Sequence, residues 1–388
     1  MSTEQADSTQ ERTAGWVREA MAQHADHAGP ERGDREQQVL DRIDRARRRK
    51  PKVREERITL AHGSGGKATQ TLVEAVFLEN LRNPVLEQLE DGAELAVGNA
   101  RLAFTTDSFV VSPLFFPGGD IGDLAVNGTV NDLAVSGARP LFLSAGFIIE
   151  EGFPVADLTR IVTSMSEAAE AAGVRVVTGD TKVVQKGGAD GCYVNTSGVG
   201  VIERRTRLGV ETARPGDAVL VSGPVGDHGI TVMLARGELD IEADVASDTA
   251  PVHEMVADLL RAAPGVRALR DATRGGVATV LNEIARASEV SVVVDEGAVP
   301  VRTEVRGASE LLGIDPLYVA CEGRIVVVVD AAQADAALRA MRAHPLGADA
   351  ANIGHVVADA PGMVLLNTAF GGTRIVDLLV GDPLPRIC

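Results

Sequence analysis

The sequence predicts an α/β (α+β) fold arranged in two domains. The chain has 388 residues, 45 % of them are hydrophobic, and short β-branched runs alternate with helical patterns. A single small domain is unusual at this length, and the apolar content is sufficient for a large core. Strands that alternate with helices indicate sheets covered by helices.

Each predicted strand is an apolar run rich in β-branched residues. These runs are residues 174–177, 218–221, 290–294 and 324–329, and we expect all of them to be buried. The predicted helices have apolar residues at helical spacing and cover 67–79, 156–172, 252–263 and 275–287. In the first helix the expected apolar face is Leu72, Val73, Val76 and Phe77.

The first part of the chain differs in composition from the rest. Residues 1–57 are poor in apolar residues, hold 13 basic and 12 acidic residues, and include a basic run at 45–52. Such a segment cannot bury enough surface to fold alone, so we expect a disordered charged tail with a short helix around 35–49. A solvated tail is favoured over an electrostatic docking arm.

The remaining residues are expected to form two domains and an arm. A polar, turn-rich stretch near 205–216 predicts a boundary between an N-terminal domain, 58–207, and a C-terminal domain, 208–380. Two prolines prevent a helix in residues 381–388, which we expect to form a flexible arm that carries Cys388.

The net charge of −17 excludes some classes of partner. Because residues 58–388 hold 25 basic and 43 acidic residues, sequence-independent binding to nucleic acid is not expected. No long uncharged apolar run predicts a membrane span, and residues 1–16 lack the pattern of a signal peptide. With three cysteines and no CxxC pattern, we expect a cytoplasmic protein without a disulfide framework.

A glycine-rich segment is the first candidate site. Gly63, Ser64, Gly65 and Gly66 precede the first predicted helix, where backbone N–H groups can bind phosphate. The spacing is not that of a P-loop. A purely structural helix cap is an equally good interpretation.

Acidic and amide side chains are concentrated between residues 107 and 132. They are Asp107, Asp120, Asp123, Asn127, Asn131 and Asp132. Hard oxygen ligands of this kind suit Mg²⁺ that is shared with nucleotide phosphates. Helix caps and turns are the alternative, but so many polar residues within apolar, glycine-rich segments favour a site.

Three later segments repeat this pattern of an apolar strand followed by polar residues. Asp180 and Lys182 follow the strand at 174–177, and a surface turn is the alternative there. Asp271 and Arg274 precede Gly275, Gly276 and a helix, where the arginine can pair with phosphate. Glu322 is a lone acid at the start of an apolar strand, so either a catalytic role or a turn is possible.

Cys388 is the most distinctive residue. A thiol on an arm stiffened by proline can enter a site or be presented to another protein, and a thiolate is a strong nucleophile. The seven histidines show no metal-binding spacing, so zinc is not expected.

Taken together, these segments resemble the HypE family of hydrogenase maturation proteins over residues 58–388. The residues that carry the resemblance are 61–66 (AHGSGG), 106–108 (TDS), 131–138 (NDLAVSGA), 179–184 (GDTKVV), 271–276 (DATRGG) and 385–388 (PRIC). The inner motifs are shared with the wider superfamily of aminoimidazole ribonucleotide synthetase, selenophosphate synthetase and thiamine monophosphate kinase. The PRIC ending is specific to HypE.

The resemblance implies a two-domain PurM-like fold whose N-terminal domains form a barrel in a homodimer, with ATP in a cleft close to that interface. It also implies a reaction. A HypF carbamoyltransferase places a carbamoyl group on the terminal thiol, and the enzyme uses ATP and Mg²⁺ to dehydrate the thiocarboxamide to a thiocyanate. The cyano group then passes to iron in a HypC–HypD complex, for [NiFe] hydrogenase.

The same resemblance implies roles for individual residues. The expected metal ligands are Asp107, Asp132, Asp180 and Asp271. The expected ATP and phosphate contacts are Gly63, Ser64, Gly65, Gly66, Asn131, Arg274, Gly275 and Gly276. Cys388 would carry the reacting group, with Glu322 as base and Lys182 as charge stabiliser. A small-molecule kinase or synthetase, or a thiol carrier without catalysis, are the alternatives.

Overall fold

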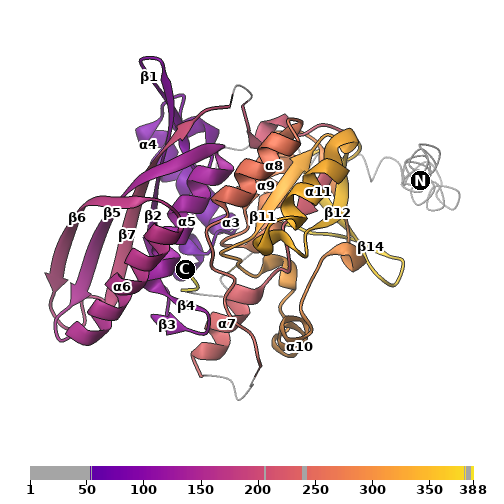
Figure 1. The fold of residues 1–388 in the computed structure, drawn as a ribbon. Coiled ribbons are helices and arrows are strands. Elements are labelled where there is room, and N and C mark those ends of the chain that lie inside the picture. Colours follow the sequence, from indigo (N-terminus) through magenta and orange to yellow (C-terminus); the bar gives the residue numbers. More distant parts are fainter. Residues whose placement is uncertain (1–52, 54, 205–206, 238–242, 380, 382–385) are drawn as a thin grey trace, which may run out of the picture. The chain divides into compact units, whose positions relative to one another are not determined.

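The computed structural model describes residues 53, 55–204, 207–237, 243–379, 381 and 386–388 (Figure 1). The helix expected around 35–49 and the basic run at 45–52 lie outside these residues. In the described part, the main elements form a five-stranded sheet and a seven-stranded sheet, each covered by helices. The predicted mixture of helix and sheet is therefore confirmed.

The five-stranded sheet is built mainly from antiparallel strands. Its order is β1 (Ala93–Val97), β2 (Ala100–Phe109), β7 (Cys192–Ile202), β5 (Ala138–Glu150) and β6 (Arg175–Val184). β5 and β6 are parallel, and α6 (Val155–Ala171) makes the crossover between them. Helices α5 (Ile121–Val135) and α6 pack on one face through a core that includes Leu124, Val130 and Ile161.

Helix α5 is buried on nearly all sides because it lies between the two sheets. It contacts β2, β5 and β7 of the first sheet, and also α8 (His253–Ala262) and β9 (Val266–Asp271). An ordinary surface helix has one polar face, whereas in α5 every residue except Asp123 is buried. Its polar residues Asn127, Asn131 and Asp132 are therefore held inside the protein.

The start of α5 corrects one prediction. The side chain of Asp120 caps the helix by accepting a 2.7 Å hydrogen bond from the Gly122 N–H group. Asp123 completes a capping box by accepting a 2.6 Å bond from the Asp120 N–H group. These two acids act as helix caps, which was the alternative interpretation, so Asp107, Asn127, Asn131 and Asp132 remain the candidates of the predicted polar group.

The seven-stranded sheet is covered on both faces at its inner strands, while its edge strand β14 (Thr373–Ile375) is exposed. Its order is β14, β13 (Met363–Asn367), β10 (Ser291–Asp295), β12 (Ala351–Val357), β8 (Ala218–Val221), β11 (Ile325–Val329) and β9. Helix α9 (Gly276–Ala287) covers one face, and α8 and α11 (Ala334–Arg342) cover the other. Successive valines of β11 point to opposite faces, which explains the uninterrupted apolar run.

The remaining elements are short or peripheral. They are α3 (Lys67–Leu72), a π-helical turn (Val73–Leu78), α4 (Glu79–Leu81), β3 (Phe115–Phe116), β4 (Gly119–Asp120), α7 (Asp227–Ala235) and α10 (Thr303–Leu312), together with several 3₁₀ turns. The predicted helix at 67–79 exists, but its apolar face is not in the core: Val76 and Phe77 are exposed.

Strand β6 also differs from the prediction. We expect residues 174–177 to be buried, and Val174 is, but β6 is an edge strand and Val176 and Val177 are exposed. The uncovered face of the same sheet carries further exposed apolar side chains, Phe104, Phe142 and Ile148. None of the described helices is long and apolar enough to cross a membrane.

Candidate active site

Strand β2 brings the first acidic residue to the interior. Side chains alternate along a strand, so Thr105 and Asp107 share its inner face while Thr106 and Ser108 point to the outer face. The Thr105 hydroxyl donates a 2.6 Å hydrogen bond to the carboxylate of Asp132 on α5. This bond fixes the helix residue against the strand.

Three carboxylates converge beside this contact. Asp91, Asp132 and Asp271 each offer an oxygen, and these oxygens lie within 4.8 Å of one another. Burial and the charges of Asp107, Asp271 and Asp91 raise the pKa of Asp132 well above its ordinary value. The pKa of Asp271 is raised well above its ordinary value by burial and by the charges of Asp91 and Asp107. Mutual repulsion of this kind is relieved by a bound cation.

Asp91 is a member of the cluster that the sequence patterns do not predict. It lies just before β1, between Glu90 and Gly92, and no apolar strand precedes it. Its carboxylate pairs with the buried guanidinium of Arg270 on β9, which also lies 3.7 Å from Glu90. The available signal was the acidic pair Glu90–Asp91 followed by glycine, a pattern that is hard to distinguish from an ordinary turn.

The β9–α9 loop and the glycine-rich segment pack against one another. Gly275 and Gly276 both have positive φ, and a Cβ atom on Gly276 would lie 2.5 Å from the Leu317 carbonyl oxygen. A Cβ atom on Gly65 would lie 2.8 Å from the main-chain oxygen of Arg274. Any residue with a Cβ atom would collide at these positions, so only glycine permits the main-chain segments to come this close. This explains why both segments contain glycine where they meet.

The C-terminal arm enters the same region. The Val110 N–H group donates a 3.0 Å hydrogen bond to the main-chain oxygen of Cys388, and the Ser112 N–H group donates one of 3.2 Å to Arg386. Ile387 is buried in the core around α5. Residues 386–388 therefore pair with residues 110–112, the segment that directly follows β2.

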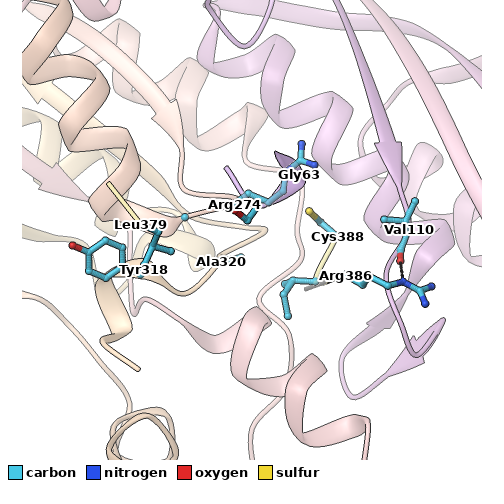
Figure 2. A pocket seen from close by; sticks show the side chains of 11 residues that line it. Gly63, Val110, Arg274, Tyr318, Ala320, Leu379, Arg386 and Cys388 are labelled. Carbon is cyan, nitrogen blue, oxygen red and sulfur yellow. Dashed lines mark hydrogen bonds between the residues drawn. The ribbon is translucent and has the colours of Figure 1, made fainter. Parts of the chain in front are cut away.

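As a result, the Cys388 side chain lies in a small pocket of about 60 Å³ and is only 9 % exposed. Figure 2 shows Cys388 between Arg274 on one side and Val110 on the other. Burial raises the pKa of the thiol to about 12, although the Arg274 charge opposes this shift. Gly63 and Ser64 also line the pocket, so the thiol meets the glycine-rich segment.

Glu322 is buried next to these groups. Its segment is joined to the Asp271 loop because the Cys321 N–H group donates a 2.9 Å bond to the Ala272 oxygen. The Asn131 amide donates a 3.0 Å bond to the Glu322 main-chain oxygen. Burial and nearby acids, Asp271 first, raise the pKa of Glu322 well above its ordinary value, and its Oε1 atom has no hydrogen-bond partner among the described residues. A buried carboxylate oxygen without a hydrogen-bond partner is costly, which favours a functional role.

The donor set fits Mg²⁺. Carboxylate oxygens are hard ligands, and the cluster places three within reach of one ion, with Asp107 close enough to influence their pKa values. The described part of the chain offers no histidine or cysteine in this cluster, as a zinc site would require.

Most predicted site residues meet here, but two do not. Asp180 and Lys182 lie on β6, are 71 % and 67 % exposed, and pair with one another at 2.6 Å. By register, Asp180 lies beside Gly146, which faces Asn195, and Asn195 faces Ser108, so Asp180 belongs to the outer face of the sheet. Asp107 belongs to the inner face. A single chain therefore does not assemble the full predicted set.

The family models agree with this architecture. Residues 89–202 match the N-terminal domain of AIR synthase related proteins, and residues 214–365 match their C-terminal domain. A carbamoyl dehydratase HypE from Rhodobacter capsulatus is 57 % identical over 339 residues, which are 87 % of this chain and 99 % of the relative. The corresponding protein from Escherichia coli K12 is 49 % identical and covers 85 % of this chain and 99 % of its own length.

Solved structures give the same result. A HypE crystallised as a HypE–HypF complex is 50 % identical, has a TM-score of 0.76, and covers 79 % of this chain and 99 % of its own. A HypE in complex with ATP is 47 % identical, has a TM-score of 0.72, and covers 86 % of this chain and all of its own. The chain therefore belongs to the HypE family of carbamoyl dehydratases, within the AIR synthase related proteins.

Proposed function

We propose that the protein dehydrates a carbamoyl group carried on its own Cys388, with ATP as co-substrate. One observation carries the proposal: the Cys388 thiol is docked beside Arg274, Glu322 and a buried carboxylate cluster. A reacting group attached to that sulfur would lie among groups that can bind phosphate and accept protons. A relative of known structure binds ATP, which supports the choice of co-substrate.

The reaction balances without an oxidant or reductant. The oxygen of the thiocarboxamide takes the γ-phosphoryl group of ATP, which breaks the bond to ADP. The carbon–oxygen bond then breaks, phosphate leaves, and the nitrogen loses both protons, which leaves a thiocyanate. Phosphorylation is needed because hydroxide is a poor leaving group, and the protein must therefore hold the phosphates in line with the carbamoyl oxygen.

The carboxylate cluster is the proposed place for the phosphates and the metal. Asp91, Asp107, Asp132 and Asp271 would hold Mg²⁺, which supplies positive charge toward the phosphate oxygens. Arg274 and the main chain of residues 63–66 and 275–276 would bind the phosphates. Asn131, the other predicted phosphate contact, instead holds main-chain groups: its amide donates to the Ala250 and Glu322 oxygens, and its side-chain oxygen accepts from the Val252 N–H group.

A larger pocket of about 600 Å³ is lined by Gly65, the residue that follows Gly63 and Ser64 of the thiol pocket. It is lined by Val73 and Leu86 and also by Glu90 and Arg270, which adjoin the carboxylates. We propose this pocket for the adenosine, because it is the larger of the two and adjoins both the glycine-rich segment and the carboxylates.

Glu322 is the proposed base for the nitrogen protons. It is buried near the thiol, and a carboxylate of raised pKa is a strong proton acceptor once ionised. Arg274 opposes the elevation of that pKa and of the Cys388 pKa, so it favours the ionised acid. It is also the proposed partner for the charge that develops on the oxygen.

A homodimer is part of the proposal. The uncovered face of the five-stranded sheet and the free edge of β6 expose Phe142, Ile148 and Val177 to water. A second copy would cover this surface and close the two sheets into a barrel. Asp180 and Lys182 can take their predicted roles as metal ligand and charge stabiliser only across such an interface, toward the partner's site.

HypF and the HypC–HypD complex are the proposed partners before and after the reaction. A docked thiol that is 9 % exposed cannot receive a carbamoyl group from another protein, so the arm must leave the pocket first. A HypE relative forms a complex with HypF, which supports that first partner. A cytoplasmic location is proposed with the function, because ATP is supplied there.

Mass spectrometry tests the proposal directly. After incubation with HypF, carbamoyl phosphate and ATP, the protein should gain about 43 Da and then lose about 18 Da, the second change only with hydrolysable ATP. Cys388→Ala should prevent both changes. ATP turnover by that variant with a small substrate would favour a kinase, and carbamoylation without dehydration would favour a carrier.

A further inference from the structure

Three successive main-chain oxygens of the arm accept hydrogen bonds from four donor residues. The oxygen of Cys388 accepts from Val110, and the oxygen of Arg386 accepts from Ser112 and, at 2.9 Å, from the Arg236 side chain. The oxygen of Ile387 accepts a 2.9 Å bond from Nε2 of His228. Two of these donors are side chains from one place, since His228 lies in α7 and Arg236 is the residue that ends it.

The protonation of His228 follows from its partners. The carbonyl oxygen of Ile387 can only accept, so Nε2 carries the hydrogen. Nδ1 must then accept the 2.7 Å bond from the Ser247 hydroxyl, whose oxygen accepts in turn from the Thr249 N–H group. The ring is fully buried and lies edge-on to Phe116 at 5.4 Å. His228 is therefore a fixed donor aimed at the arm.

Arg236 ties the arm to the segment with which it pairs. Its Nε atom donates a 2.9 Å bond to the Ser112 oxygen while its Nη2 atom donates to the Arg386 oxygen. Neither Arg236 nor His228 lines the thiol pocket, and neither belongs to the carboxylate cluster.

We propose that His228 and Arg236 form a clamp that seats the last residues of the arm and so holds the Cys388 thiol in its pocket. Both are positioning residues. The clamp grips main-chain oxygens, so it is independent of what is attached to the sulfur, and it can hold the arm both with a free thiol and with a carbamoyl group. When the arm leaves, the buried Nε2–H group of His228 loses its acceptor, which favours return to the docked position.

This inference rests on the proposed function only for its purpose, and its test does not depend on catalysis. The rate at which iodoacetamide alkylates Cys388 is measured on the full chain without ATP or HypF, by mass spectrometry of the C-terminal peptide. His228→Phe, which cannot donate, should raise the rate at least tenfold. His228→Gln keeps a donor and should stay near the wild-type rate. Buried Cys192 is the internal control, and His355→Phe, a half-buried histidine away from the arm, is the matched variant.

An unchanged Cys388 rate in His228→Phe would overturn the clamp, as would an equal increase at Cys192, which indicates general loosening. Arg236→Met provides a second variant at the other end of α7 and should also raise the rate at Cys388 alone. In the HypF assay, His228→Phe should be carbamoylated normally and dehydrated more slowly, with His228→Gln restoring the rate. If the wild type is never dehydrated, the proposed function fails, while the alkylation rates still decide the clamp.

Discussion

The main chain of Val110 donates a 3.0 Å hydrogen bond to the main-chain oxygen of Cys388. Val110 directly follows β2, and Asp107 lies three residues earlier on the inner face of that strand. One strand thus sets both the position of a carboxylate and the position of the docked thiol. The separation between the acidic cluster and the reacting sulfur is therefore fixed by a short piece of rigid backbone, as an in-line transfer requires.

Asp132→Asn should separate stability from activity. Burial and three neighbouring acids destabilise the ionised form of Asp132 and so raise its pKa in the folded protein. The free energy of unfolding therefore decreases as the pH rises above about 4. The variant removes this cost and still accepts the Thr105 hydrogen bond. Its free energy of unfolding in EDTA at pH 7 should increase by about 1–2 kcal/mol, measured by urea denaturation. Carbamoylation should persist and dehydration should stop.

Asp123→Asn is the matched control because it changes an acid of the same helix outside the cluster. It should dehydrate the carbamoyl group normally. Normal dehydration by Asp132→Asn would contradict the metal assignment.

Glu322→Gln should block removal of the nitrogen protons, a step that comes after carbamoylation and ATP binding. The amide is nearly isosteric with the acid but cannot accept a nitrogen proton, so the rate of dehydration should fall by about 10²–10⁴. ATP binding and carbamoylation should be unchanged, since Glu322 does not belong to the group of carboxylates that could hold a metal ion. Single-turnover mass spectrometry of the carbamoylated protein measures the rate. A rate within twofold of wild type would exclude Glu322 as the base.

The fold and much of the candidate site could be predicted from the sequence because their signals are local. The β11 run IVVVV indicates a strand that is buried on both faces. The pattern of Asp271, Arg274 and two glycines indicates the end of a strand, a turn and the start of a helix. Asp91 gave no such signal, because its position depends on the pairing with Arg270 in a distant strand. Asp120 and Asp123 gave a false signal, because capping acids and metal ligands have the same composition.

Burial was predicted less well than secondary structure. The runs at 174–177 and 218–221 have similar composition, yet the first begins the exposed edge strand β6 and the second forms the buried interior strand β8. Strand order follows from the topology of the whole sheet, which a local apolar run does not encode. An apolar edge strand is also what a dimer interface produces, so the mismatch at β6 itself supports the proposed dimer.

Val177→Arg should disrupt the proposed dimer. A charged side chain on an exposed apolar edge strand cannot be buried against a second copy without a large desolvation cost, while the isolated chain tolerates it. Sedimentation velocity should show a shift from dimer to monomer with unchanged circular dichroism. A dimer that survives this substitution would exclude β6 from the interface.

Lys182→Ala should remain a dimer but lose dehydration. If Lys182 acts on the partner's thiol, mixing this variant with Cys388→Ala should restore activity, because one site in each mixed dimer has both residues. Random pairing predicts recovery of about a quarter of the wild-type sites. If the mixture of the two variants stays inactive, Lys182 acts only within its own chain or has no role in the reaction.

Acid should weaken the protein through His228. Burial lowers the pKa of His228 to about 4, below its ordinary value of 6.5, so the ring that bonds to Ser247 and Ile387 is neutral in the folded protein at pH 7. Between these two values the unfolded chain binds the proton and the folded chain does not, so stability falls as the pH decreases from 6.5 toward 4. At pH 4.5 the loss should be about 2–3 kcal/mol relative to pH 7. Because glutamine does not titrate, urea denaturation of His228→Gln should show a loss that is smaller by this amount. A constant difference in unfolding free energy between wild type and His228→Gln from pH 7 to 4.5 would mean that the ring accepts the proton in the folded state, and then the clamp cannot depend on its neutral form.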